Sequence, residues 1–363
     1  MNLAGRMRLR PGAALPTISS SRPMLAARVA RGRPADDLPG TLGALFTLCA
    51  HAHRLTARRA VMAARGEVAV STPSDRLTLR AGTAREHVLR IAHDWHRLLP
   101  GAPAAEPALR LRSCPLWRDD LDVHDQLADL PAWLAHHWLA EPVSSWLAAH
   151  RLDPQGWTAR WSAAADTPLA RLLCSQRKAM LSIATPARPL RLLDAPLATM
   201  PRLARRMAEE PGFCARPDWL GVPAETGPWT RVADVACAPI HNAWMRLVAR
   251  LVDLLQLSLP QGHDRLAEGA LPLGPGEAVA WTEMARGLLV HWVQLEDGPQ
   301  RARVADCRVL APTEWNFHPN GVLAQALAGL QGEARADQAA CAAVAFDPCV
   351  DFDIQLLPEP VHA

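Results

Sequence analysis

The sequence predicts an α+β protein that is predominantly helical, a helical bundle with small β elements. Three observations carry this prediction. Residues 240–257 show the clearest helical periodicity of the chain. Residues 128–162 place five tryptophans among leucine and alanine, a composition typical of packed helices. Two apolar runs, 288–295 and 301–310, flank the turn sequence Glu-Asp-Gly-Pro and predict a β-hairpin.

The first 40 residues hold five prolines with glycine and serine between them. Proline removes a backbone donor and glycine loosens the chain, so residues 1–40 are predicted to form an irregular leader. The remainder, 41–363, is predicted to be a single domain. Within it, residues 100–215 are predicted to form a divergent, tryptophan-rich helical region, outside the motif-bearing parts of the chain.

The segment from Leu42 to Arg65 is predicted to be one helix, because it contains no proline and Gly66 is a typical C-terminal stop. Cys49 and His53 lie four residues apart on it, so they should share one face.

Two short strands are then predicted, at Val68–Val70 and Arg76–Arg80. A helix over Ala84–Leu98 should follow and end before Pro100.

The tryptophan-rich stretch has two interpretations. In the first, Trp133, Trp138, Trp146, Trp157 and Trp161 are large apolar anchors between packed helices. In the second, some of them are exposed on a surface that binds a partner. For residues 240–257, Trp244, Leu247, Val248, Leu251 and Leu255 share one stripe of the predicted helix, and Pro260 follows its end.

Composition excludes several classes of function. The net charge of +3 gives no indication of nucleic-acid binding. No apolar run reaches the roughly 18 residues of a membrane span, and the N-terminus lacks the apolar core of a signal peptide. A cytoplasmic protein without membrane insertion is therefore expected. The eight cysteines are scattered without a Cys-x-x-Cys pair, which argues against disulfides and against an iron–sulfur cluster.

Two cysteine motifs stand at opposite ends of the chain. Residues 46–53 read FTLCAHAH and residues 347–355 read DPCVDFDIQ. They resemble the two metal-binding motifs of the large subunit of nickel–iron hydrogenases, Cys-x-x-Cys-x-x-x-His and Asp-Pro-Cys-x-x-Cys-x-x-His. Each motif here lacks one cysteine, because Phe46 and Phe352 stand in the places of the first and the last one. Gln355 stands where the family has its closing histidine.

The middle of the chain carries the same resemblance. Residues 283–292 (EMARGLLVHW) are similar to the large-subunit stretch Glu-Ala-Pro-Arg-Gly-x-Leu-x-His-Trp, and residues 311–316 (APTEWN) to Val-Pro-Thr-Thr-Trp-Asn. Upstream, residues 225–231 (ETGPWTR) are similar to Glu-x-Gly-Pro-Leu-Ala-Arg. The likeness covers roughly residues 40–66 and 220–355, and it implies the large-subunit fold.

A relative of the large subunit that lacks half of the cysteines resembles the HupK/HoxV family of hydrogenase assembly proteins. This resemblance implies a non-catalytic scaffold that transiently binds an Fe(CN)2(CO) group and passes it to the immature nickel–iron hydrogenase large subunit. The implied partners are that subunit and the maturation chaperone complex that delivers the iron group.

The resemblance also implies the site residues. Cys49 matches a bridging thiolate and Cys349 a thiolate on nickel alone. Two thiolates cannot build the four-thiolate nickel site, and phenylalanine has no lone pair, so no nickel is expected. An iron that already carries cyanide and carbonyl needs few protein ligands, and thiolate suits it. The remaining matched residues would act around the metal.

Four such residues are matched. Arg286 and Thr313 match the residues that recognise the cyanide and carbonyl ligands, and an arginine suits an anionic complex. His53 and Asp347 match positions that orient or polarise the cysteine thiolates.

Each assignment has an alternative. Cys49 and Cys349 could be small buried hydrophobic residues, and His53 a structural histidine. Arg286 could be a structural residue paired with a carboxylate such as Glu283. At the level of function, the alternative is a metal-free interaction protein that mimics the large-subunit surface and binds maturation partners. An active hydrogenase is disfavoured by Phe46 and Phe352.

Overall fold

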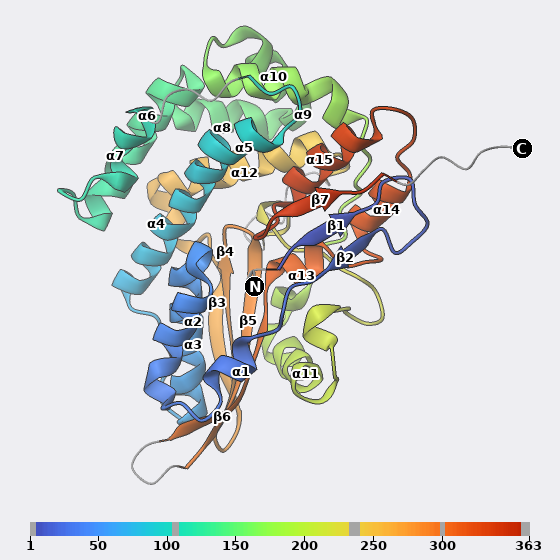
Figure 1. Cartoon of the computed structure of the whole chain (residues 1–363). Coiled ribbons are helices and arrows are strands. Elements are labelled where there is room, and N and C mark those ends of the chain that lie inside the picture. Colours follow the sequence, from blue (N-terminus) through green and yellow to red (C-terminus); the bar gives the residue numbers. More distant parts are fainter. Residues whose placement is uncertain (1–4, 104–108, 232–239, 298–301, 357–363) are drawn as a thin grey trace, which may run out of the picture.

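The computed structural model describes residues 5–103, 109–231, 240–297 and 302–356 (Figure 1). In these ranges the helices are α1 (Ala26–Ala30), α2 (Leu38–Leu45), α3 (Ala50–Ala64), α4 (Pro73–Leu89), α5 (Trp95–Leu98), α6 (Leu109–Arg112), α7 (Val123–Leu134), α8 (Val143–Leu152), α9 (Pro154–Ala164), α10 (Pro168–Leu181), α11 (Pro196–Glu209), α12 (Ala243–Ser258), α13 (Pro312–Asn316), α14 (Val322–Ala328) and α15 (Arg335–Phe346). The strands are β1 (Met7–Leu9), β2 (Ile18–Ser20), β3 (Glu268–Gly274), β4 (Glu277–Met284), β5 (Gly287–Glu296), β6 (Arg303–Leu310) and β7 (Phe352–Ile354).

An antiparallel sheet with the order β3-β4-β5-β6 separates two layers of helices. Helix α3 packs on one face of the sheet and α11 on the other. An apolar core lies between each of these helices and the sheet. The predicted hairpin is confirmed as β5 and β6, with Val293 opposite Cys307; the tip at 298–301 lies outside the described residues. Strands β3 and β4, which the sequence analysis missed, complete the sheet.

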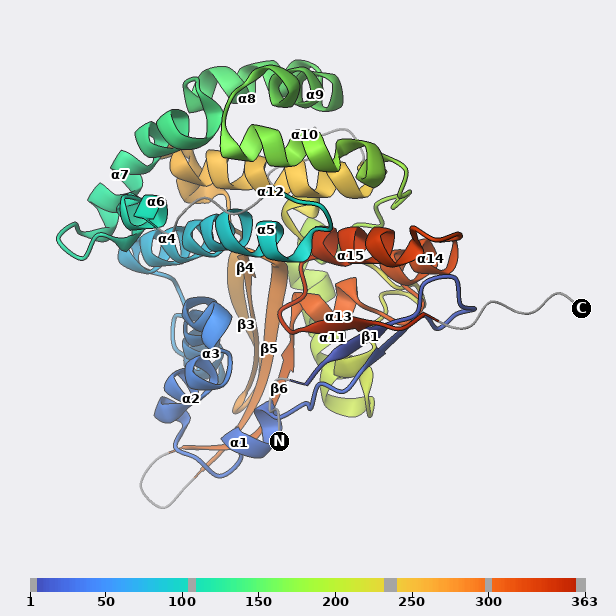
Figure 2. The same ribbon diagram turned by 45° about the horizontal axis from the view of Figure 1, so that its top comes forward.

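The largest core lies in the helical layer above the sheet, where α12 contacts α4, α7, α10 and α15 (Figure 2). The predicted helix at 240–257 is confirmed as α12. Trp133, Trp138, Trp146 and Trp161 are all buried in this core. The interpretation of the tryptophans as packing anchors is therefore confirmed for these four.

The N-terminal leader is not irregular, and this part of the sequence analysis is wrong. Strand β1 pairs with β2 and, in parallel, with β7, so that Met7 lies opposite Phe352. Leu9 and Ile18 are buried in the main core. A sheet that joins the two ends of the chain forms by long-range pairing, which proline counting within the leader does not detect.

The helix predicted from Leu42 to Arg65 is interrupted. Phe46 has φ −113° and ψ 64°, outside the helical region, and a short 3₁₀ turn over Thr47–Cys49 joins α2 to α3. The ring of Phe46 stacks on His53 at a centroid distance of 4.1 Å, so packing outweighs the local helical preference here. The predicted stop at Gly66, with φ +75°, is confirmed.

Both strands predicted near residues 68–80 are wrong. Val68 and Val70 are exposed and lie outside any strand. Residues 76–80 belong to α4, which begins with a capping box between Thr72 and Asp75 and has proline at its first position. The predicted helical stop at Leu98 is confirmed as the end of α5, after a π-helical segment over Arg90–Asp94.

Candidate metal-group site

The structure brings the two cysteines of the terminal motifs to one place. Cys49 is buried and caps the start of α3, while Cys349 lies on the turn between α15 and β7. They are close enough that the charge of one affects the other. Burial raises the pKa of the Cys49 thiol far above its usual range, and Glu86 adds to this, whereas Arg286 and Arg22 oppose it.

Phe46 and Phe352, which replace the other two cysteines, have different surroundings. Phe46 leads into the turn before Cys49 and covers the ring of His53. Phe352 is part of β7 and pairs with Met7 of β1. Phe46 therefore forms part of the wall of the site, whereas Phe352 forms part of a sheet.

Thr313 lies beside Cys349. Its hydroxyl donates a hydrogen bond to Cys349 Sγ over 3.1 Å. Thr313 is buried in the first turn of α13, where Pro312 takes the first helical position and needs no donor. This hydrogen bond holds the Cys349 sulfur beside the first turn of α13.

Arg286 occupies the tip of the hairpin between β4 and β5, and its side chain is only 3% exposed. Its Nη1 donates to Glu86 over 2.6 Å, and its Nε lies 3.4 Å from Asp347. The next residue, Gly287, has φ +124°, and an added Cβ would lie 2.6 Å from Thr226 Oγ1. Only glycine fits this turn, which aims Arg286 inward.

Glu283 is not the partner of Arg286, as the alternative in the sequence analysis had it. Glu283 accepts a hydrogen bond from the backbone of Ala267 and lies 3.7 Å from Arg231. Glu283 belongs to β4, whereas Arg286 follows the strand at the hairpin turn, and the two side chains pair with different residues.

Asp347 is the centre of a buried charge cluster, called here the Asp347 cluster: Asp347, Arg90, Arg250 and Arg286. The carboxylate lies 2.5 Å from Arg90 and 2.6 Å from Arg250. Burial alone would raise the pKa of Asp347, but the arginines, Arg250 foremost, hold it well below its usual range. None of these contacts to Asp347 has the alignment of a regular hydrogen bond.

The cluster also fixes the position of Cys349. Asp347 directly follows α15 with φ +56°, and Arg90 donates to the carbonyl of Pro348 over 2.8 Å. Arg90 opens the π-helical segment after α4. Such segments often occur at functional sites, and this one places a guanidinium against the chain just before the cysteine. Among the described residues, the contacts of the Asp347 carboxylate are with arginines and not with a sulfur.

His53 lies against Phe46 and His291. Its Nδ1 is 3.1 Å from His291 Nε2, and its own Nε2 is buried without a partner among the described residues. Burial lowers the pKa of both histidines, that of His291 to about 3, so both are neutral. No hydrogen bond joins His53 to a cysteine in the described part of the chain.

Three further residues of the site were missed by the sequence analysis. Glu86 on α4 pairs with Arg286, and burial raises its pKa to about 7 although Arg286 opposes this. Arg22, in the leader, lies 2.5 Å from Glu314 and interacts electrostatically with both cysteines. Glu314 follows Thr313 in the quoted motif, so its position carried a signal, whereas Glu86 and Arg22 lie outside every motif.

A second buried network stands behind the first. Asp253 on α12 binds Arg231 and His87 over 2.6 and 2.7 Å, and it also contacts Arg265. His87 in turn contacts Arg250 of the Asp347 cluster over 2.9 Å. The two networks tie α4, α12 and the β4–β5 hairpin into one support for the site.

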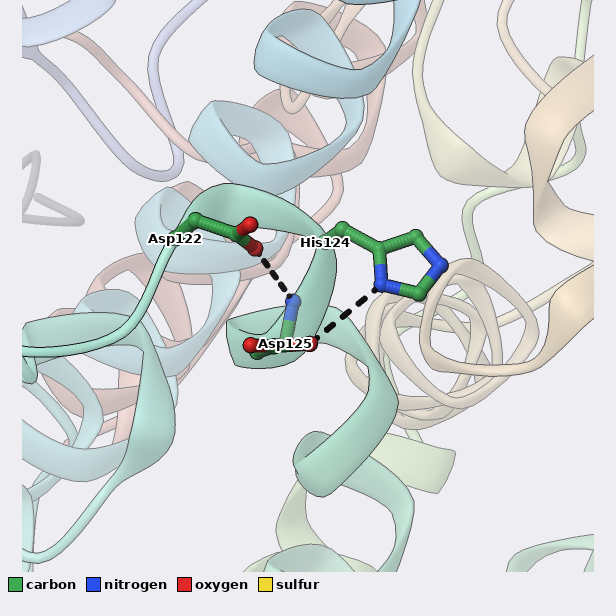
Figure 3. Close-up of side chains that lie close together, drawn as sticks. All are labelled: Asp122, His124 and Asp125. Atoms are coloured by element: carbon green, nitrogen blue, oxygen red, sulfur yellow. Dashed lines mark hydrogen bonds and ion pairs between the residues drawn. The ribbon is translucent and has the colours of Figure 1, made fainter.

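One other group of possible metal ligands lies far from the cysteines in sequence. Asp122, His124 and Asp125 are exposed at the start of α7 (Figure 3). Asp122 caps the helix by accepting a hydrogen bond from the Asp125 backbone over 2.8 Å, and His124 Nδ1 lies 3.4 Å from Asp125. Helix capping explains this group without a metal.

Comparison with known proteins agrees with the geometry. The chain is 40% identical to the hydrogenase expression/formation protein HoxV of Cupriavidus necator, over 99% of this chain and 98% of that protein. It is 30% identical to the hydrogenase expression/formation protein HupK of Bradyrhizobium diazoefficiens, over 92% and 90% of the two chains. This chain belongs to the HoxV/HupK family of hydrogenase expression/formation proteins. No protein-family model matches the sequence.

Solved structures show the fold. The nickel–iron–selenium hydrogenase of Desulfovibrio vulgaris Hildenborough aligns with a TM-score of 0.52 at 15% identity, over 92% of each chain. An NAD⁺-reducing nickel–iron hydrogenase aligns with a TM-score of 0.51 at 18% identity, over 90% of each. The predicted large-subunit fold, helical with small sheets, is thus confirmed. Among the described residues, no helix is both long and apolar enough to cross a membrane.

Proposed function

We propose that this protein is a hydrogenase assembly scaffold. It transiently binds an iron that carries two cyanides and one carbonyl, and it passes this Fe(CN)2(CO) group to the immature nickel–iron hydrogenase large subunit. A maturation chaperone complex would deliver the group. The observation that carries the proposal is the meeting of Cys49 and Cys349, beside Thr313 and the buried arginines.

The donor set fits a soft metal that needs few protein ligands. Two sulfurs are available, those of Cys49 and Cys349. Phe46, which stands in the place of a third cysteine, offers no lone pair to a metal. The iron is substrate here, because it leaves again. Since burial raises the pKa of Cys49, this thiol must lose a proton that it holds tightly before it can bind iron. Such a site binds less tightly than one with four thiolates, and transfer to the large subunit then runs downhill.

Arg286 offers a donor that suits an anionic guest. Asp347 lies against Arg90, Arg250 and Arg286, while Asp94 pairs with Arg90 and Glu86 with Arg286. The contacts of Arg286 use Nη1 and Nε, and no described residue accepts from its Nη2. This N–H group is available for a cyanide nitrogen, in a buried place where a charge-assisted hydrogen bond is strong.

Infrared spectroscopy and metal analysis test the proposal. The protein is purified anaerobically from a host that assembles nickel–iron hydrogenase. Carbonyl and cyanide stretching bands are expected together with iron, and nickel should be substoichiometric or missing. A folded protein that carries neither iron nor these bands would reject the scaffold and favour the metal-free interaction protein. Equimolar nickel and iron would reject both.

A further inference from the structure

A cavity of about 300 Å³ adjoins the site. It lies beside the edge strand β6, between α1 and the end of α11, each of which contacts β6. Its volume is at the lower end of small-molecule pockets, roughly 300–1,000 Å³. Exposed residues at its rim, among them Glu210, Pro211 and Ala215, open it to solvent.

The inner wall of this cavity is also the outer wall of the site. Arg22, Phe46 and Glu314 line the cavity. Arg22 interacts electrostatically with Cys49 and Cys349, and Phe46 begins the turn that leads to Cys49. Glu314 is adjacent in sequence to Thr313, which touches Cys349. The side chains of this wall therefore adjoin both the cavity and the region of the two sulfurs.

The cavity contains groups that suit an anionic, soft-metal complex. Cys214 and Cys307 both line it, and they are close enough to affect each other electrostatically. Burial raises the pKa of each thiol to about 12, so at neutral pH they are neutral. Neutral thiols offer a polarisable surface without holding iron firmly.

We infer that this cavity is the passage through which the Fe(CN)2(CO) group enters and leaves, with the Arg22–Glu314 pair as its inner gate. The inference rests on the proposed function. Arg22 lies 2.5 Å from Glu314 Oε1, while Glu314 Oε2 is buried without a partner among the described residues. The pair is thus incompletely satisfied. Arg22 can exchange this carboxylate for a cyanide nitrogen, and Phe46 separates the two spaces.

A plugged cavity tests the passage. Ala215→Trp places a large side chain at the mouth, and Ala27→Trp does so at the side of α1. The matched control is Ala198→Trp, on an exposed position of α11 that does not line the cavity. Each variant is induced in the maturation-competent host, and iron and cyanide band area per folded chain are followed over time.

We expect both plugged variants to fill at least about tenfold more slowly, equivalent to a barrier raised by about 1.4 kcal/mol. Ala198→Trp should fill like the parent chain. Melting temperatures checked on the same samples restrict the comparison to folded protein, and two plugs at different walls guard against a folding defect in one of them.

Normal filling rates in both plugged variants would overturn the passage and leave the scaffold function untouched. A parent chain that never shows cyanide bands would instead reject the scaffold function itself. The two failures are therefore distinguishable.

Discussion

The Asp347 cluster and the tryptophan layer of α7–α9 are both buried, but the cluster consists of charged side chains and the layer of apolar ones. The layer contains Trp133, Trp146 and Trp161, which gain free energy from leaving water. The cluster buries three guanidinium groups around one carboxylate, and each buried ion costs several kcal/mol of desolvation. A buried ion network is weak evidence for stability, so we expect this one, beside the cysteines, to serve the binding proposed above.

This contrast assigns different consequences to substitution in the two regions. Changes in the tryptophan layer should lower stability and leave the iron group per folded molecule unchanged. Substitutions at the site should abolish or weaken binding of the iron group. Where they also lower stability, a second substitution should restore the stability without restoring the binding.

The largest effect is expected at the sulfurs. Cys49→Ala should abolish the carbonyl and cyanide bands, because Cys49 matches a bridging position and no other described side chain replaces its sulfur there. Cys349→Ala should lose less. Cys341→Ala, a buried cysteine of the helical layer, is the matched control and should keep the bands. Full bands in Cys49→Ala, together with their loss in Cys349→Ala, would reverse the order of the two ligands.

Trp146→Ala should lower the free energy of unfolding by about 3–5 kcal/mol, because it leaves a cavity in the core. Trp146 is fully buried, stacks on His150 and makes an edge-to-face contact with Trp161. Denaturant unfolding measures the loss, and infrared bands per folded molecule should be normal. Selective loss of the bands would show that the layer supports the site more directly than its packing indicates.

Arg286→Met should both destabilise the chain and weaken binding. Breaking a buried pair costs about 3–5 kcal/mol when the partner charge is left alone, and Glu86 would be that partner. The double variant Glu86→Gln/Arg286→Met should regain most of this stability. It should not regain the iron group, whose charge-assisted hydrogen bond is worth about 1.5–3 kcal/mol, roughly a factor of ten to a hundred in affinity.

Arg286→Lys gives the intermediate case. It keeps the charge, but an ammonium cannot contact Glu86 and Asp347 in the planar geometry of a guanidinium, so rescue should be partial. If the double variant holds the group normally, Arg286 serves only to balance Glu86.

How much of the fold and of the site could be predicted from the sequence depends on whether each feature arises from neighbouring residues or from residues far apart in the chain. The helix at 240–257 and the β5–β6 hairpin follow from local periodicity. The pairing of β1 with β7 joins residues at opposite ends of the chain, and no local pattern encodes it. Motif resemblance selected Cys49, Cys349, Arg286 and Thr313, which the structure brings together, but motif membership says nothing about partners.

The partners explain what the motifs left out. Glu86 in the last turn of α4 and Arg90, one turn later at the start of the π-helical segment, look like ordinary surface residues in sequence. Helix α12 packs on α4, and Arg286 and Asp347, from distant parts of the chain, pair with Glu86 and Arg90. The break at Phe46 is a similar case, since it arises from stacking on His53 and not from a helix-breaking residue.

The smallest effect is expected from pH, and it belongs to the tryptophan layer. Burial lowers the pKa of His150 to about 4, and its ring stacks on Trp146 at 5.1 Å. Between pH 6.5 and 4, His150 is therefore protonated in the unfolded chain but neutral in the folded chain. Stability from this group is fully present above the unfolded pKa and is lost as pH falls toward the folded one, by up to about 2 kcal/mol after allowance for partial exposure.

The variant His150→Phe keeps a stacked ring and removes the proton site. Its unfolding free energy should fall less than that of the parent chain between pH 7 and pH 4.5, as measured by denaturant titration at each pH. The chains should differ little above pH 7, apart from a constant offset. If both lose stability in parallel, the acid sensitivity lies elsewhere, with the carboxylates of the buried networks as the first candidates. Asp347 and Asp253, whose pKa values arginines hold low, would then be the groups whose protonation opens the site region before the tryptophan layer.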